Sequence, residues 1–216
     1  MHIEFVHCLL TAGPTIEPLD EVRRLTNHST GRLGCQLSDA LSRAGHQVTL
    51  LLSETARHRP RQKKIRIIPF NTSADLRYQL QDAKSTGIRA VFHVAAVSDF
   101  RVCRLLNPKT RRPLTSKKIP TQSGPLLLEL EPTPKIIRQL RRWFPDAKIV
   151  GWKYEVDSGH DAIFAKARDQ IKKCRTDACV ANGPGYGEGF CFVTDDSTTH
   201  HPSATALIRM LISALP

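Results

Sequence analysis

Apolar segments of two kinds alternate along most of the chain. Continuous apolar runs, typical of parallel strands covered on both faces, predict strands at residues 4–11, 47–53, 65–70, 89–98, 148–156 and 177–183. Between these runs, apolar residues recur at helical spacing and predict helices over about 32–44, 73–85, 133–143 and 160–174. This alternation predicts an α/β fold, a Rossmann-like three-layer domain with a mostly parallel sheet and helices on both faces.

The other segments predict additions to that sheet. LLLELE at 126–131 predicts a further strand, GFCFVT and TTHHPS predict a hairpin around 195–197, and 203–215 predicts an amphipathic C-terminal helix. Residues 101–124 are basic, contain three prolines and show no period, which is typical of a functional or disordered loop. We therefore expect residues 1–216 to form a single domain that carries a flexible basic flap at 101–124.

Composition and charge narrow the class of protein. No run approaches the roughly 18 apolar residues of a membrane helix, and the first strand lacks the basic flank of a signal peptide. We expect a soluble, cytoplasmic protein, with no membrane partner, whose six scattered cysteines are reduced. The formal net charge of +12 indicates either solvated basic faces or a field that attracts polyanions such as nucleoside triphosphates or nucleic acid.

The segment after the first predicted strand is the first candidate site, because ligands of open α/β sheets bind beyond the carboxyl ends of strands. The strand ends at 11–13, and the polar cluster 27–31 leads into a helix that opens at Arg32. Backbone N–H groups at a helix start suit a phosphate, and Gly31 and Gly34 let it approach closely. The alternative is that Ser29 and Thr30 are ordinary helix caps.

Two later strand ends carry further candidates, while the common nucleotide motifs are absent. A GxGxxG fingerprint would need glycines where Thr15 and Pro18 stand, and no GxxxxGK[ST] loop exists. Asp99 follows a strand that ends in two alanines, and Trp152 and Asn182 lie near the ends of two other strands. A capping aspartate, a core tryptophan and a turn asparagine are the corresponding structural alternatives.

Six motifs, taken in order, resemble the phosphopantothenoylcysteine synthetase family. They are TAGPTIEPLDEVRRLTNHSTGRLG at 11–34, AAVSDF at 95–100, Lys118-Ile119, EPTPKI, GWKYE and VAN. The resemblance covers roughly residues 8–195, and its first two motifs are specific to that family as a pair. It implies the stand-alone form, without the decarboxylase domain that precedes it in many bacterial members.

The resemblance implies a homodimeric ligase whose active site is completed by both subunits. The implied reaction joins 4'-phosphopantothenate to L-cysteine through an acyl-nucleotidylate in coenzyme A biosynthesis, using CTP or ATP with Mg²⁺. The implied nucleotide-binding residues are Gly13, Ser29, Gly31, Gly34, Trp152 and Asn182. The implied substrate-binding residues are Asn27, with Ala95, Ala96 and Asp99 reaching in from the partner subunit. The implied catalytic residues are Asn27 and the flap residue Lys118; the metal ligands are unknown.

The sequence departs from the family pattern at positions that concern the nucleotide. Lys118-Ile119-Pro120-Thr121 stands where the bacterial CTP-dependent enzymes carry a KxKK flap, and Trp152 stands where they have phenylalanine. Gln170 and Cys174 stand where lysines are expected. Two other classes stay open: a nicotinamide- or flavin-dependent oxidoreductase, disfavoured by the missing GxGxxG, and a basic nucleic-acid-binding module, disfavoured by an aromatic content of 6%.

Overall fold

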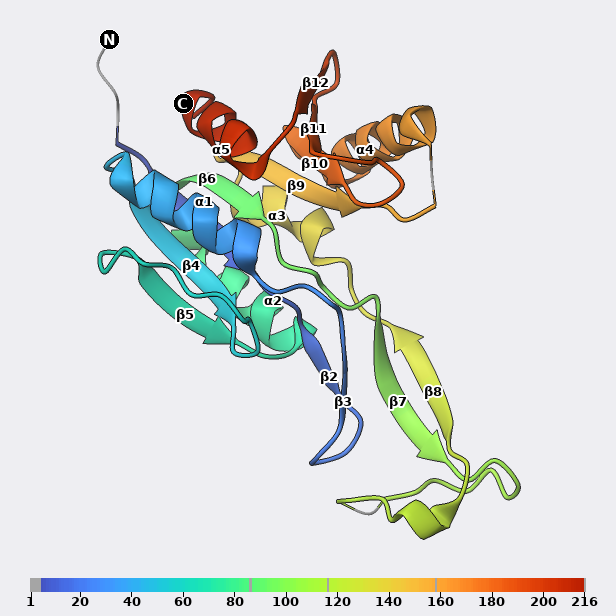
Figure 1. The fold of residues 1–216 in the computed structure, drawn as a ribbon. Coiled ribbons are helices and arrows are strands. Elements are labelled where there is room, and N and C mark those ends of the chain that lie inside the picture. The colour runs from blue at the N-terminus through green and yellow to red at the C-terminus, as the bar shows by residue number, and fades with distance from the viewer. Residues whose placement is uncertain (1–4, 86, 116, 158, 216) are drawn as a thin grey trace.

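An eight-stranded sheet forms the centre of the computed structural model, which describes residues 5–85, 87–115, 117–157 and 159–215 (Figure 1). Its strand order is β12-β11-β10-β9-β6-β1-β4-β5. The strands are β1 (His7–Ala12), β4 (Gln47–Ser53), β5 (Arg66–Phe70), β6 (Ile88–His93), β9 (Lys148–Tyr154), β10 (Ala178–Asn182), β11 (Phe190–Val193) and β12 (Thr198–His201).

Six neighbouring strands of this sheet run parallel to one another: β5, β4, β1, β6, β9 and β10. β11 is antiparallel to β10, and β12 is antiparallel to β11, as the predicted hairpin requires. β12 therefore points the same way as the parallel strands and ends at the same edge of the sheet. The Rossmann-like expectation of a mostly parallel sheet is confirmed.

Helices cover both faces of the sheet, as the two apolar faces of its strands require. They are α1 (Arg32–Arg43) and α5 (Ala204–Ser213) on one face, and α2 (Ser73–Asp82), α3 (Leu140–Trp143) and α4 (His160–Cys174) on the other. Neighbouring residues of β1 separate the layers: Leu10 belongs to the cluster of α1 and α5, and Leu9 to that of α2 and α3. Burying each such leucine contributes about 1.5–3 kcal/mol.

Local signals set several helix ends where the sequence predicts them. At the start of α2, Thr72 Oγ1 accepts a hydrogen bond from the Asp75 N–H at 3.0 Å. At the start of α5, Ser203 Oγ accepts one from the Ala206 N–H at 3.2 Å. α1 ends just before Gly45, whose φ of +95° lies in the left-handed region that glycine tolerates best.

Two predicted elements differ from the structure. The helix predicted from 133 starts later, as the 3-10 turn η3 (Ile136–Gln139) that continues into the single turn of α3. The strand predicted at 89–98 ends at His93, because the chain then leaves the sheet and crosses the end of β1. There the Ala96 N–H donates to the Gly13 carbonyl at 3.0 Å. Apolar residues outside the sheet had lengthened the strand prediction, whereas Thr133-Pro134, a common helix-start signal, had placed the helix start too early.

Two short antiparallel pairs project from the carboxyl edge (Figure 1). One is the hairpin of β2 (Ile16–Pro18) and β3 (Arg24–Thr26), and the other is an arm of β7 (Phe100–Leu106) and β8 (Leu127–Pro132). β8 was predicted, but β7 lies in the segment predicted to be a flexible flap, so that prediction was wrong for its first residues. The remaining 3-10 turns are η1 (Ala83–Ser85) and η2 (Thr121–Ser123).

Charge pairing across the arm explains why β7 showed no apolar period. Arg101 pairs with Glu131 at 2.6 Å, and Arg104 pairs with Glu129 at 2.9 Å. These pairs are exposed, so screening by water and salt keeps the stabilisation from each pair small. A strand whose partners are charged side chains on the facing strand cannot be recognised from an apolar pattern alone.

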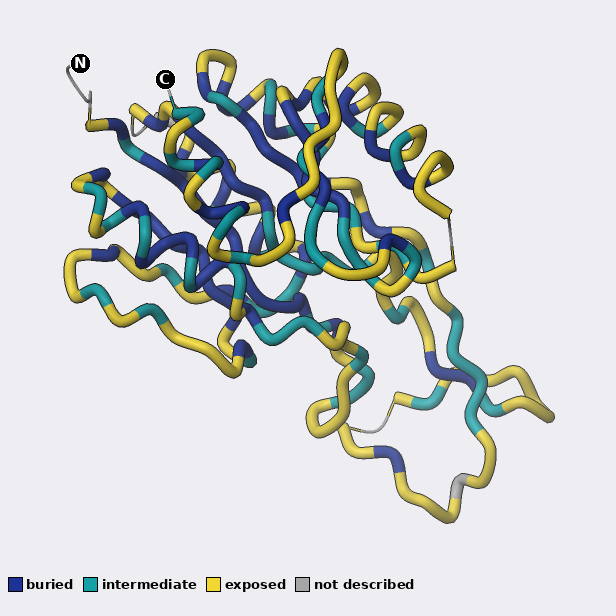
Figure 2. The backbone as a smooth tube through the Cα atoms, turned by 45° about the horizontal axis from the view of Figure 1, so that its top comes forward, coloured by how far each residue is buried: buried dark blue, intermediate teal, exposed yellow. Residues whose placement is uncertain are grey.

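Buried residues concentrate in the central sheet and on the inner sides of its helices, whereas most residues of the arm are exposed or half-buried (Figure 2). None of the described helices is long and apolar enough to cross a membrane. All six cysteines, each within the described residues, are free, and all but Cys103 are buried.

Candidate functional site

A cleft of about 520 Å³ opens at the carboxyl edge of the sheet, between the starts of α1 and α5. Its lining comes from the segment 29–34 with Gln36, from Gly13 and Val94 after β1 and β6, from Asn182 and Phe190, and from the segment 203–205. Five of the six predicted nucleotide-binding residues are in that lining: Gly13, Ser29, Gly31, Gly34 and Asn182. The fold thus brings together residues up to 169 positions apart in the sequence.

The segment 29–34, here called the cradle, depends on glycine at three places. Gly13 and Gly31 have φ of +89° and +76°, which side-chain-bearing residues rarely adopt. A Cβ on Gly31 would lie 3.0 Å from the Cβ of Ala56, and one on Gly34 would lie only 2.4 Å from the Cβ of Ala12. α1 therefore packs onto β1 and the loop after β4 at a separation that only glycine permits.

The first turn of α1 presents backbone N–H groups without acceptors inside the helix. Gly31 is the N-cap, and the first intrahelical bond runs from the Cys35 N–H to the Gly31 carbonyl at 3.1 Å. The amides of Leu33 and Gly34 precede that bond, so helix geometry provides no partner for them. The alternative in which Ser29 or Thr30 is the helix N-cap was wrong. These amides, at the positive end of the helix, suit a phosphate.

Asn27 lies beside Ala96 of the same chain. Asn27 Nδ2 donates a hydrogen bond to the Ala96 carbonyl at 3.0 Å, and that carbonyl also accepts from the Thr15 N–H at 3.1 Å. Ala95 is next to it, and its N–H donates to Thr11 Oγ1 at 3.1 Å. The resemblance implied that both alanines reach in from a partner subunit; the fold itself places Ala96 next to Asn27 within one chain.

Trp152 and Asp99 do not line the cleft as the structure describes it. Trp152 in β9 packs against the core cluster under α1 and α5, and its indole Nε1 is buried without a hydrogen-bond partner among the described residues. Asp99, just before the arm, forms an ion pair with Lys135 and accepts the Thr133 N–H at its carbonyl. Binding roles for Trp152 and Asp99 stay predictions.

Lys118 lies away from the cleft of its own chain, beside the turn between β2 and β3. The neighbouring Ile119 is tied to that turn: its N–H donates to the Asp20 carboxylate at 3.3 Å, and its carbonyl accepts from Arg23 at 2.8 Å. The same Arg23 guanidinium holds the pKa of Asp20 well below its usual range. Lys118 itself is exposed, so the structure anchors its neighbour and leaves its own side chain in solvent.

Phe190 and the segment 203–205 line the cleft but were not predicted as site residues. β11 runs antiparallel and therefore begins at the edge where the parallel strands end. β12 reverses once more and ends there, which delivers the start of α5 to the cleft. The strand-end rule would have found the segment 203–205 if it had been applied to the second strand of the predicted hairpin.

His93, the last residue of β6, is a buried group next to the cleft residue Val94. Thr11 Oγ1 accepts from the Ala95 N–H, so its own proton is available to His93 Nδ1, 2.9 Å away. That bond requires a neutral ring. Burial lowers the pKa of His93 to about 4.

We expect the free energy of unfolding to fall as the pH is lowered from about 6.5 toward 4. In the unfolded chain His93 is protonated near its ordinary pKa, whereas in the folded protein the buried ring is protonated only near pH 4. The contribution of His93 to the free energy of unfolding is therefore complete above pH 6.5. It is lost on acidification, by up to about 3 kcal/mol. Urea unfolding at several pH values measures this loss.

The matched variant is His93→Gln, which cannot titrate. Burial also lowers the pKa of His46 and of His201, but both remain in the variant. His93→Gln should therefore flatten the pH dependence without removing it. An identical dependence in wild type and variant would contradict the assignment to His93.

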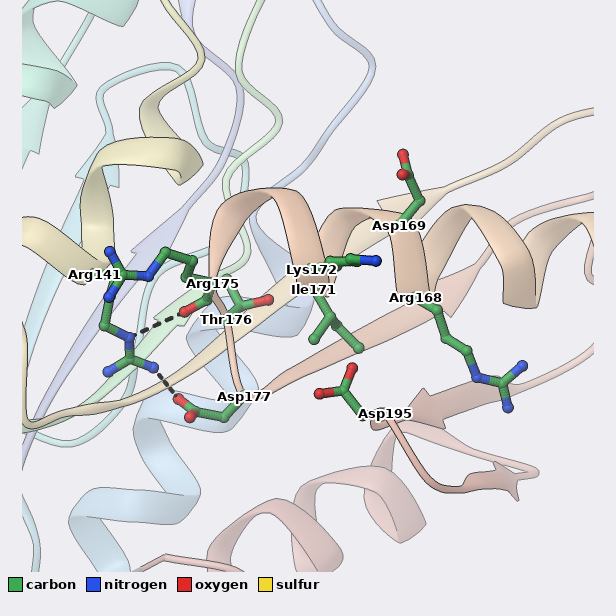
Figure 3. A pocket seen from close by; sticks show the side chains of 9 residues that line it. All are labelled: Arg141, Arg168, Asp169, Ile171, Lys172, Arg175, Thr176, Asp177 and Asp195. Carbon is green, nitrogen blue, oxygen red and sulfur yellow. Dashed lines mark hydrogen bonds and ion pairs between the residues drawn. The ribbon is translucent and has the colours of Figure 1, made fainter.

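A second hollow, of about 650 Å³, lies at the opposite edge of the sheet, where Asp177 precedes β10 and Asp195 follows β11 (Figure 3). Arg141 stands at one end of it and donates to the Arg175 carbonyl at 3.0 Å and to Asp177 at 2.6 Å. Arg141 also donates to carbonyls that follow α3. These bonds tie α3 to the end of α4, so Arg141 has a structural role, and no predicted site residue lines this hollow.

Comparison with known families matches residues 4–206 to the "DNA/pantothenate metabolism flavoprotein C-terminal domain". Among curated proteins, the coenzyme A biosynthesis bifunctional protein CoaBC of Thermococcus kodakarensis is 31% identical over 181 residues, which are 83% of this chain and 42% of that protein. The chain spans less than half the length of the curated relatives that it matches.

Solved structures share this fold over nearly the whole chain. The DNA/pantothenate metabolism flavoprotein from Streptococcus pneumoniae has a TM-score of 0.85 at 26% identity, covering 96% of this chain and 97% of that one. A mutant of Cab2, solved in complex with phosphopantothenate-cysteine, has a TM-score of 0.75 at 20% identity, covering 97% and 85%. At that identity the second likeness concerns the fold.

Proposed function

Because this chain belongs to the phosphopantothenoylcysteine synthetase family, matched as the DNA/pantothenate metabolism flavoprotein C-terminal domain, we propose that it ligates 4'-phosphopantothenate to L-cysteine. The observation that carries the proposal is the meeting of the cradle, Gly13 and Asn182 in one cleft, with Asn27 and Ala96 beside Gly13. The name of the CoaBC relative and the ligand of the Cab2 structure support the substrates.

The proposed reaction proceeds through an acyl-nucleotidylate. A carboxylate oxygen of phosphopantothenate attacks the α-phosphorus of the nucleotide, the bond to the bridging oxygen breaks, and pyrophosphate leaves with the electron pair. The amine of cysteine then attacks the acyl carbon, which forms the amide and releases the nucleoside monophosphate and a proton. Neither step needs a side-chain nucleophile, so the enzyme contributes positioning and charge neutralisation.

The cradle and Asn27 have complementary roles in this proposal. The free amides at the start of α1 bind a phosphate group, and Asn182 contacts the nucleoside at the other side of the cleft. Asn27 donates one side-chain N–H to the Ala96 carbonyl. Its second N–H and its oxygen can therefore bind the carboxyl end of phosphopantothenate. A neutral amide orients that group without holding it in an ion pair.

Magnesium enters the proposal as part of the nucleotide substrate. The described residues that line the cleft include no carboxylate, and the part of the chain that the structure describes has no group of three or more potential metal ligands. A metal site built by the protein alone therefore does not fit. Mg²⁺ commonly keeps several waters and binds through substrate phosphates. The net charge of +12 attracts these acidic substrates.

A direct assay tests the proposed function. The whole protein is incubated with phosphopantothenate, cysteine, Mg²⁺ and either CTP or ATP, and the product mass and pyrophosphate are measured. We expect one amide product with stoichiometric pyrophosphate, and the faster nucleotide identifies the preferred one. Absence of the product with both nucleotides would contradict the ligase proposal.

Asn27→Asp should lower turnover by roughly 10- to 100-fold, the scale of a lost hydrogen bond to a charged group. The new carboxylate would face the Ala96 carbonyl and the substrate carboxylate, and would repel both. The control is Asn107→Asp in the arm, where the side-chain oxygen accepts from the Lys109 and Thr110 N–H groups and a carboxylate accepts equally well. Equal turnover in both variants would remove Asn27 from the proposed site.

A further inference from the structure

The basic run at 57–64, in the loop after β4, has no role in the reaction proposed so far. Two of its arginines hold the loop in place. Arg59 donates to the Ala56 carbonyl at 2.7 Å and to the Glu54 carbonyl at 3.1 Å. The Arg61 N–H donates to the carboxylate of Asp39 in α1 at 2.7 Å. The loop is therefore a fixed structure that packs against α1.

The backbone at Arg57 and His58 is fixed directly against the cradle. Both N–H groups donate to the Thr30 carbonyl, at 3.0 Å and 3.3 Å, and Thr30 lines the cleft. The His58 carbonyl accepts from Cys35 Sγ in the first turn of α1 at 3.5 Å. The hydrogen bonds from the Arg57 and His58 N–H groups therefore hold the Arg57 backbone beside Thr30, at the rim of the cleft.

The side chain of Arg57 is available for a ligand. It is exposed, and within the described residues it forms no hydrogen bond or ion pair. A guanidinium presents donors in a planar fork that matches phosphate oxygens, and it stays charged at every physiological pH. An unpaired arginine at the rim of a phosphate-binding turn is therefore suited to bind a second phosphate group.

The order of the strands along the carboxyl edge indicates which part of a bound nucleotide would lie near Arg57. Along the carboxyl edge, Asn182 ends β10, Val94 follows β6, Gly13 follows β1, and the loop of Arg57 follows β4. Four strand spacings separate β10 from β4, roughly 19 Å at the usual distance between strands. An extended nucleoside triphosphate with its nucleoside at Asn182 and a phosphate at the cradle directs its terminal phosphates toward Arg57.

We propose that Arg57 binds the β- and γ-phosphates of the nucleotide and stabilises pyrophosphate as the leaving group. The inference rests on the proposed function, in which the bond between the α-phosphorus and the bridging oxygen breaks. The electron pair stays on the departing β-phosphate, and the guanidinium neutralises that charge without transferring a proton. Arg57 adds a cation at the end of the cleft opposite to Asn182.

Arg57→Gln tests this role with two measurements on the whole protein. The KM for the nucleotide should rise about 10- to 100-fold, the factor that a lost charge-assisted hydrogen bond corresponds to. The affinity for inorganic pyrophosphate, measured by calorimetry without any turnover, should fall by a similar factor. Arg57→Lys, which keeps the charge but loses the fork, should give intermediate values for both.

Lys63→Gln is the matched control, because it removes the same charge from an exposed residue of the same loop. It should leave both measurements within about twofold of wild type, since exposed charges at a distance are screened by salt. The inference is overturned if Arg57→Gln leaves both values unchanged, or if Lys63→Gln lowers binding equally. If Arg57→Gln weakens pyrophosphate binding but the wild-type protein makes no amide product, only the ligase proposal is contradicted. If the wild-type protein makes the product and Arg57→Gln changes neither the KM nor the pyrophosphate affinity, only the role of Arg57 is contradicted.

Discussion

Lys118→Gln is expected to lower the turnover number by roughly 100- to 1000-fold, the effect of removing a donor that stabilises developing transition-state charge. The lysine would neutralise charge at the α-phosphate, where two anions must meet. Its side chain is exposed, so the unfolding midpoint should not change. Pyrophosphate release measures the first effect and thermal unfolding the second. The matched control is Lys117→Gln, whose lysine pairs with Glu21 at 3.5 Å. An equal loss of turnover in both variants would mean that Lys118 acts only through its general positive charge and has no specific role.

The position of Lys118, away from the cleft of its own chain, makes the homodimer that the family resemblance implies testable. If the flap of one subunit acts on the cleft of the other, Lys118→Gln subunits mixed with Asn27→Asp subunits form hybrid dimers with one intact site. On mixing, the activity should then rise above that of either variant alone. No recovery, in a mixture shown to exchange subunits, would mean that Asn27 and Lys118 serve the same subunit or that Lys118 has no role.

Gly34→Ala is expected to destabilise the protein by about 1–3 kcal/mol, the usual cost of overpacking. Helix propensity alone predicts the opposite sign, because alanine is better than glycine in a helix by about 1 kcal/mol. The new Cβ, however, would lie 2.4 Å from the Cβ of Ala12 and close to its backbone. Neither atom belongs to a flexible side chain, so α1 must move away from β1. The cradle moves with it, and nucleotide affinity should fall at least about tenfold, as expected when several positioned donors are lost together.

Gly159→Ala separates this clash from a generic effect of replacing glycine. A Cβ there meets no described atom within 4 Å, and its φ of −70° suits any residue. The cost should be at most about 1 kcal/mol, because Gly159 is the N-cap of α4 and alanine is a poorer cap. Thermal unfolding and nucleotide binding check both variants. Normal stability and normal affinity in Gly34→Ala would contradict the close packing of α1 on β1.

The chain's local patterns were sufficient to predict most of the central layer. QVTLLLS predicted β4 with its bounds, and the helix predicted over 160–174 agrees with α4. Continuous apolar runs and helical spacing are patterns among residues that are close in the sequence, so they can be recognised without the fold. The same signals placed the helix start at Arg32. They failed at β7, where Arg101 and Arg104 face glutamates that lie 30 and 25 residues further along the chain. No local pattern can show a partner at that distance.

The candidate site divides in the same way. Residue types and their order along the chain were enough to predict which segments carry chemistry: a glycine-bearing turn before α1, an asparagine at the end of β10, and an excess of positive charge. The folded chain was needed to show that Phe190 and the start of α5 share their cleft, that Ala96 lies beside Asn27, and that Arg57 lies at the rim. The physical reason is that strand order and strand direction arise from hydrogen bonds between distant segments. Periodicity reports only on which face of its own element a residue lies.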